Sequence, residues 1–119
     1  MDDEEFWFLR HGSEAYPLYL ALRERIAALG PFAVKVQKTQ IDFRSKRLFA
    51  CISMPRRKGE AGLLLTFGLP YPVFHPRIAE RAEPYPGRWT HHLLFSSPEE
   101  LDADLVGWLQ EAYAFADRP

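Results

Sequence analysis

The sequence predicts an α+β domain in which an antiparallel β-meander sheet lies between an N-terminal and a C-terminal helix, both packed on one face of the sheet. Apolar side chains recur at helical spacing before residue 30, at every second position from Phe32 onward, and at helical spacing again after Ser97. A chain of 119 residues has the usual size of one domain. We therefore expect a single domain over residues 1–119.

The first long helix is predicted over residues 13–29, with Ser13 as its N-cap residue. Gly30-Pro31 ends it, because glycine suits the residue after a helix and proline cannot continue one. A short helix is expected before it, over residues 4–9. The apolar stripe of the long helix consists of Tyr19, Leu22, Ile26 and Leu29.

Alternation of period two predicts strands within residues 32–54, and an apolar run over 62–69 predicts a fourth strand. Half of the ten prolines fall in residues 70–87, which predicts a surface loop or edge strand there, since proline lacks a ladder donor. Tyr85-Pro86-Gly87-Arg88 has the pattern of a type II turn. That turn is expected to join a short strand over 78–83 to a longer one over 88–95.

The C-terminal helix has the clearest start signal. Ser97-Pro98-Glu99-Glu100 is a capping box with proline at the first helical position. The stripe that follows consists of Leu101, Leu105, Trp108, Leu109, Ala112 and Phe115. Neither face of the predicted sheet is wholly polar, so we expect residues 6–9, a second subunit or a ligand to cover part of the second face.

Composition favours a soluble cytoplasmic protein without a membrane segment. Apolar residues make up 47% of the chain, yet the longest nearly apolar run covers only residues 62–70. The N-terminus is acidic, unlike a signal peptide, and Cys51 is the only cysteine, so no internal disulfide can form.

Motifs of the common enzyme classes are absent from the sequence. It contains no phosphate-binding glycine loop and no nucleophile elbow, and one cysteine with four scattered histidines does not suit a zinc site. We predict no metal and no cofactor. His91 is expected to be a hydrogen-bonded core residue, because it shares a face with Leu93, whereas His92 shares the opposite face with Thr90.

Charge is unevenly distributed. Residues 31–58 carry eight basic side chains and one acidic one, a balance of +7 in a chain of net charge −1. This asymmetry predicts contact with a nucleic acid or a smaller anion. Strand geometry divides the basic segment into two clusters, one at each end of the strand that follows Arg47. The predicted polyanion contacts are Lys38, Arg44, Lys46, Arg56, Arg57 and Lys58.

The favoured hypothesis is a non-enzymatic binding module for an anionic ligand or nucleic acid. The predicted ligand-binding residues are Arg47, Arg88, Thr90, His92 and His75. One alternative is an enzyme with a pocket near loop 70–87, for which His75, His92 and Cys51 are the available catalytic side chains. Another is a protein–protein interaction or homo-oligomerisation domain that uses the second sheet face.

Five segments carry a resemblance to a known family: 18–26 (LYLALRERI), 46–50 (KRLFA), 75–78 (HPRI), 88–92 (RWTHH) and 98–101 (PEEL). Together they resemble a bacterial family known only as a domain of unknown function, numbered 5655. That resemblance covers nearly the whole chain and implies no activity and no site residues. Residues 89–113, a strand with a tryptophan that leads into a capped helix, are more weakly similar to the YjbR-like (MmcQ-like) domains, which implies a small α+β fold and DNA binding.

Overall fold

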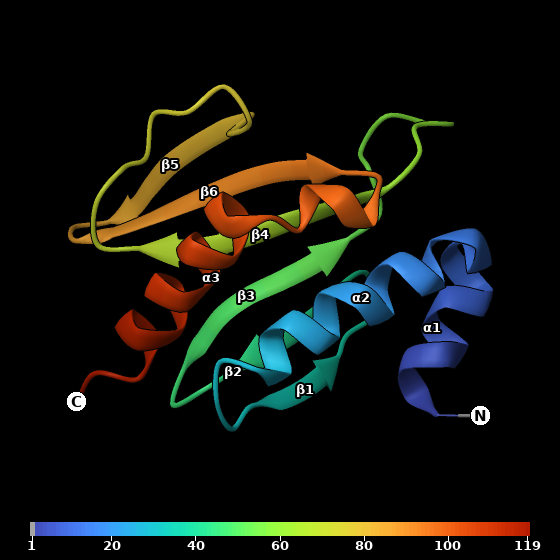
Figure 1. Cartoon of the computed structure of the whole chain (residues 1–119), viewed down its shortest axis with the longest axis horizontal. Helices are drawn as coiled ribbons and strands as arrows, with labels where there is room; N and C mark the ends of the chain where they lie inside the picture. The colour runs from blue at the N-terminus through green and yellow to red at the C-terminus, as the bar shows by residue number, and fades with distance from the viewer. Residues whose placement is uncertain (1) are drawn as a thin grey trace.

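The computed structural model of the chain describes residues 2–119 (Figure 1). Within these residues the chain forms three α-helices and six strands, which confirms the predicted α+β class. The helices are α1 (Asp3–His11), α2 (Tyr16–Ala27) and α3 (Ala103–Ala116). The strands are β1 (Ala33–Val36), β2 (Ile41–Arg44), β3 (Leu48–Ser53), β4 (Leu63–Leu69), β5 (Glu80–Tyr85) and β6 (Arg88–Phe95).

All neighbouring strands are antiparallel, in the order β1-β2-β3-β4-β6-β5. The first four strands follow one another as a meander. The chain then crosses to the outer edge as β5 and returns as β6 between β4 and β5. Pro84 lies in β5, where an edge strand tolerates the lost donor, as the sequence predicted.

The hydrophobic core lies between one face of the sheet and the helices. Figure 1 shows α2 in front of β1 to β3, and α3 in front of β3 and β4. Tyr19 of α2 stacks on Phe43 of β2, with ring centroids 6.0 Å apart. The inward side chains of the sheet are buried because every second position faces the helices. They include Ile41, Phe43, Ala50, Ile52, Leu63, Leu65, Phe67, Leu69, Leu93 and Phe95.

The proline-rich loop, residues 70–79, covers the part of this face that no helix reaches. The backbone N–H of Val73 donates to Nε2 of His91 at 2.9 Å, and His91 is fully buried. The sequence prediction of a hydrogen-bonded core histidine is therefore confirmed. Burial lowers the pKa of His91, so the ring is neutral and can accept this bond.

Two predicted helix starts differ from the structure. Ser13 is not an N-cap; it begins a 3₁₀ turn over Ser13–Ala15, and α2 starts at Tyr16 without a side-chain cap. The capping box at Ser97 is present, but it caps the N-terminus of a short 3₁₀ turn over Pro98–Glu100, and α3 begins only at Ala103. Asp102 is the N-cap of α3, because its carboxylate accepts from the N–H of Leu105 at 3.1 Å.

The N-terminal helix α1 is longer than the predicted segment 4–9 and does not cover the second sheet face. Trp7 and Phe8 are buried, and Phe8 packs on Tyr19 at 4.9 Å between ring centroids. The indole N–H of Trp7 donates to the carbonyl of Lys38 in the β1–β2 turn. Within residues 2–119, the face of the sheet opposite the helices, called the open face below, is covered by no helix.

Substitution of Leu65 by alanine is expected to lower the free energy of unfolding by about 2–5 kcal/mol, because a fully buried side chain leaves a cavity. Leu64→Ala is the matched control. The two residues are adjacent on β4, but Leu64 lies half-buried on the open face, so its loss should cost about 1 kcal/mol or less. Urea unfolding of both variants measures the difference. Equal losses would contradict a core on one face only.

Candidate functional site

Polar side chains form a row across the open face. Cross-strand pairing aligns Asp42 of β2 with Cys51 of β3, Cys51 with Thr66 of β4, and Thr66 with His92 of β6. Residues paired in this way point to the same face of a sheet. Cys51, Thr66 and His92 are half-buried, whereas Asp42 is only 3% exposed.

The two ends of this row are engaged in hydrogen bonds. The side-chain amides of Gln37 and Gln40 donate to the two carboxylate oxygens of Asp42, at 3.0 and 2.6 Å. Oγ1 of Thr66 lies 3.0 Å from Nδ1 of His92. Burial lowers the pKa of His92, with a further decrease from the charge of Arg56, so the imidazole is neutral at pH 7.

Cys51 lies in the middle of the row but is not an activated nucleophile. Burial, with a smaller contribution from the charge of Asp42, raises the pKa of its thiol to about 11. The hydrogen bond with Thr66 and the charge of Arg88 lower the pKa only in part. A reactive cysteine needs a depressed pKa, so this thiol suits a structural role.

The side chain of Arg88 on the open face occupies the space left by the missing side chain of Gly68, which we call the niche. Arg88 begins β6, and its guanidinium lies over Gly68 of β4, so that a Cβ built on Gly68 would stand 2.5 Å from the guanidinium carbon. Glycine within a strand costs conformational entropy, and the close approach of Arg88 explains its presence here. Thr90 is the strand partner of Gly68 and points to the same face.

Arg88 also lines a hollow of about 330 Å³ at the end of the sheet where β3 and β6 begin. Within residues 2–119, three arginines and no acidic side chain line this hollow, which we call the arginine hollow. Its residues are Arg47, Leu48, Tyr85, Pro86, Gly87, Arg88, Phe115, Ala116, Arg118 and Pro119.

The three guanidinium groups keep most of their hydrogen-bonding capacity. A guanidinium Nη1 of Arg47 donates to the backbone carbonyl of Arg118 at 2.6 Å, and the guanidinium of Arg118 lies over the ring of Phe115 at 5.3 Å. In the described part of the chain, none of the three forms an ion pair within 4.0 Å. Each guanidinium has five N–H donors, so the hollow presents uncompensated positive charge.

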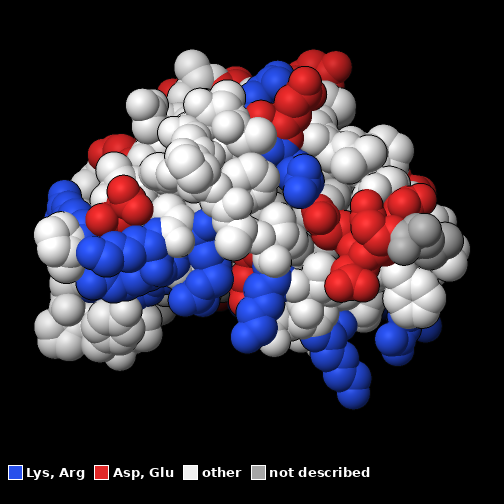
Figure 2. Space-filling view, turned by 90° about the horizontal axis from the view of Figure 1, so that it is seen from below, with Lys and Arg blue, Asp and Glu red and all other residues white. Residues whose placement is uncertain are grey.

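A second, shallow hollow of about 480 Å³ lies on the other side of the β2–β3 turn. Arg44 and Lys46 line it, together with Asp117. Figure 2 shows a group of blue side chains at the left, the end of the molecule where the C label lies in Figure 1, with red atoms beside it. Further blue side chains lie along the lower edge, and the larger red group lies at the right. Two of the predicted polyanion contacts, Arg44 and Lys46, thus lie beside the arginine hollow.

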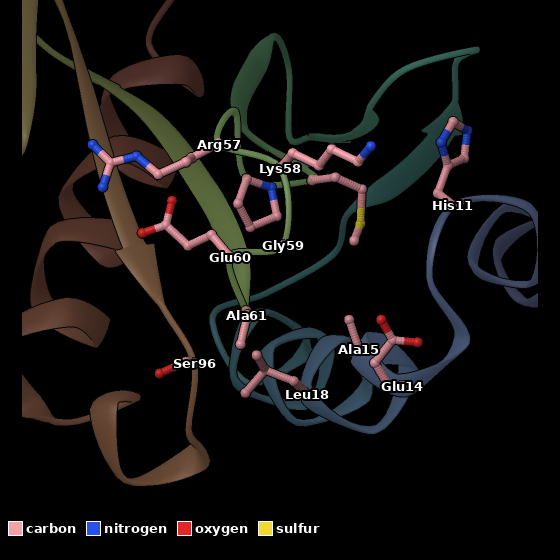
Figure 3. Close-up of a pocket in the computed structure, with 13 residues that line it drawn as sticks. His11, Glu14, Ala15, Leu18, Arg57, Lys58, Gly59, Glu60, Ala61 and Ser96 are labelled. Atoms are coloured by element: carbon pink, nitrogen blue, oxygen red, sulfur yellow. The ribbon is translucent and has the colours of Figure 1, made fainter.

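The remaining predicted polyanion contacts lie elsewhere and are accompanied by acidic residues. Arg56 forms an ion pair with Glu80 at 3.0 Å. Arg57 and Lys58 line a hollow of about 440 Å³ between the β3–β4 loop and the start of α2, and Glu14 and Glu60 line the same hollow (Figure 3). Lys38 lies in the β1–β2 turn. The chain therefore has no continuous basic groove within residues 2–119.

The predicted ligand residues are brought together only in part. Arg47 and Arg88 share the arginine hollow, whereas Thr90 and His92 lie farther along β6 on the open face. His75 lies on the opposite side of the sheet, in loop 70–79, with its ring 5.0 Å from that of Trp108 in α3. The structure therefore separates His75 from the predicted site.

The three side chains considered as catalytic for an enzyme are not brought together either. Cys51 and His92 are both strand partners of Thr66 on the open face. His75 packs against α3 instead, and its Nε2 lies 3.8 Å from a carboxylate oxygen of Asp104. The three share no hollow among those described. A homo-oligomer that uses the open face stays a prediction.

Sequence reasoning missed three residues of the site: Gly68, Tyr85 and Arg118. Gly68 interrupts an otherwise apolar strand, a pattern that signals close approach of another group. Arg118 follows the predicted C-terminal helix, and only the packing of α3 against β3 brings it beside Arg47. No local pattern marks that contact.

Two other kinds of feature are absent from the described part of the chain. Residues 2–119 contain no cluster of three or more histidine, cysteine, aspartate or glutamate side chains with the geometry of a metal site. None of the helices in the same range has the length and apolar character that crossing a bilayer requires.

Comparison with known protein families shows the family to which the chain belongs. The model of the family described as Domain of unknown function (DUF5655) matches residues 8–116, which extend from α1 to the end of α3. The chain belongs to this family. The match confirms the resemblance to DUF5655, whereas the similarity to YjbR-like domains is not shown. No curated protein and no solved structure matches the chain. The DUF5655 description assigns no activity, so the candidate site is identified from its geometry alone.

Native Cys51 is expected to react slowly with iodoacetamide at pH 8. With a thiol pKa of about 11 rather than the ordinary 9.0, the thiolate fraction, and with it the rate, falls about 100-fold relative to the chain unfolded in urea. Mass spectrometry over a time course measures both rates. Because the chain has one cysteine, the unfolded chain is its own control. Equal rates in the two states would contradict the raised pKa.

Proposed function

We propose that this member of the DUF5655 family is a non-enzymatic binding module whose ligand carries an anionic group that occupies the arginine hollow. The observation that supports this function is the hollow itself: Arg47, Arg88 and Arg118 line it without an acidic side chain and without an ion pair in residues 2–119. Such a cluster is stabilised when an anion is bound, because the three charges otherwise repel one another.

The chemistry of the side chains favours a phosphate or carboxylate group. Guanidinium groups are planar forks that donate two parallel hydrogen bonds to such oxyanions. Arg88 is held in its niche over Gly68, so less side-chain freedom is lost when the anion binds. The raised pKa of Cys51 keeps its thiol protonated at pH 7, so this face supplies no thiolate nucleophile, which favours binding over catalysis.

Substitution of Arg88 or Arg47 by glutamine is expected to weaken the binding of pyrophosphate about tenfold or more, because each change removes charge-assisted hydrogen bonds. Isothermal titration calorimetry at 50 and 200 mM salt measures the Kd. Arg57→Gln is the matched control: it removes one positive charge at the opposite end of β3, in a hollow that also contains Glu14 and Glu60. Its Kd should change less than twofold.

A second variant keeps every charge and tests the geometry. Gly68→Ala places a methyl group 2.5 Å from the guanidinium carbon of Arg88, so the side chain must leave its niche. Pyrophosphate binding should weaken as it does in Arg88→Gln. Equal weakening in Arg57→Gln and Arg88→Gln would contradict a defined site, and a Kd above the millimolar range in the unsubstituted protein would contradict the function.

A further inference from the structure

One aromatic side chain of the arginine hollow is exposed and projects from a conformationally restricted turn. Tyr85 ends β5 and has 59% of its surface exposed. Pro84 and Pro86 flank it, and Gly87 has a φ of +83°, as the third residue of a type II turn requires. This turn was predicted from the sequence. Proline restricts the backbone on both sides of Tyr85, so little backbone freedom is lost when a ligand binds at this turn.

The same turn places Tyr85 beside the arginine in the niche. Tyr85 and Arg88 are strand partners across the β5–β6 turn, and partners of an antiparallel pair point to the same face. The phenol ring of Tyr85 and the guanidinium of Arg88 therefore belong to neighbouring residues on the same side of the sheet. Both line the arginine hollow, and Arg47 lines it from the β2–β3 side.

The ring of Tyr85 has no stacking partner within residues 2–119, neither another aromatic ring nor a cation over its face. Phe115 also lines the hollow, but the guanidinium of Arg118 already covers its ring. Large exposed aromatics beside a cationic cluster are uncommon on a surface that only needs to be solvated, and they mark recognition sites.

We propose that the arginine hollow binds a nucleotide unit, with the phosphate at Arg47 and Arg88 and the base stacked on Tyr85. This inference rests on the proposed anion-binding function and names the class of ligand. Bases stack on tyrosine irrespective of their sequence, since every base has a π-face. The chemistry of the hollow of about 330 Å³ suits a nucleotide, because cationic side chains for the phosphate and apolar side chains for the base line it together.

The same chemistry occurs in a free nucleotide and in single-stranded nucleic acid. Arg44 and Lys46 line the neighbouring hollow, across the β2–β3 turn from Arg47. A second phosphate of a single strand bound at Arg47 would lie toward these two cations, whereas a mononucleotide would not reach them. The two sources therefore differ in their dependence on Lys46.

The test compares adenosine 5′-monophosphate with ribose 5-phosphate, which has the same phosphomonoester and no base. Calorimetric titration should give about tenfold tighter binding of the nucleotide. Tyr85→Ala should remove that difference, and Tyr85→Trp should keep or increase it. Phe74→Ala is the matched control, because Phe74 is a more exposed aromatic (75%) in loop 70–79 and does not line the hollow.

A short oligoadenylate distinguishes the two sources. If single-stranded nucleic acid is the ligand, the oligonucleotide binds more tightly than the mononucleotide, its affinity falls with salt, and Lys46→Gln weakens only the oligonucleotide. If the free nucleotide is the ligand, the two bind alike and Lys46→Gln changes neither.

Two results would overturn the inference, and they separate it from the proposed function. Equal affinity for the nucleotide and ribose 5-phosphate, with both weakened by Arg88→Gln, would refute base recognition and leave anion binding intact. Binding of neither compound, and of no pyrophosphate, would refute both. Circular dichroism of every variant checks that the fold is retained, so that a loss of binding reports on the site.

Discussion

The fold depends on the central strand β4. Its neighbour β3 precedes it directly along the chain, whereas its neighbour β6 follows only after loop 70–79 and β5. Its inward side chains are nearly or fully buried under α3. A strand that has neighbours on both edges and a helix on one face directs every second side chain into the core. That constraint assigns Leu65 and Phe67 to the core and Thr66 and Gly68 to the open face. The register of β4 therefore determines both the core and the site.

Because the core lies on one side only, the open face accepts groups that a two-sided core would exclude. Asp42 and Arg88 lie on it without an ion pair to each other, the first satisfied by two glutamine amides and the second lying over a glycine. A charge that is oriented but not neutralised costs folding energy, which a bound counter-charge returns. In the proposed function, the anionic ligand supplies that counter-charge to Arg88 in its niche over Gly68.

The helices, the alternation of the strands, the capping box and the β5–β6 turn were predictable because they follow from neighbouring residues. The starts of α2 and α3 were not, since Ser13 and Ser97 each begin a 3₁₀ turn before the helix proper. The place of β6 between β4 and β5 depends on pairing over distant residues. For the site, Arg47 and Arg88 were predicted from charge, but the separation of His75 and the arrival of Arg118 depend on tertiary packing that no local pattern encodes.

Loop 70–79 covers part of the core, and side-chain hydrogen bonds hold most of it, with one backbone bond to β6 from the N–H of Ala79 to the carbonyl of His92 at 2.9 Å. Arg77 binds Asp102 and the carbonyl of Glu100, and Arg81 binds the carbonyl of Val73. A loop held in this way can detach from the core while the strands of the sheet stay paired. The backbone amides of loop 70–79 should therefore exchange with solvent through a local opening whose free energy is lower than that of global unfolding. Each opening wets His91. The cover and the sheet therefore behave as two units of different cooperativity within one small domain.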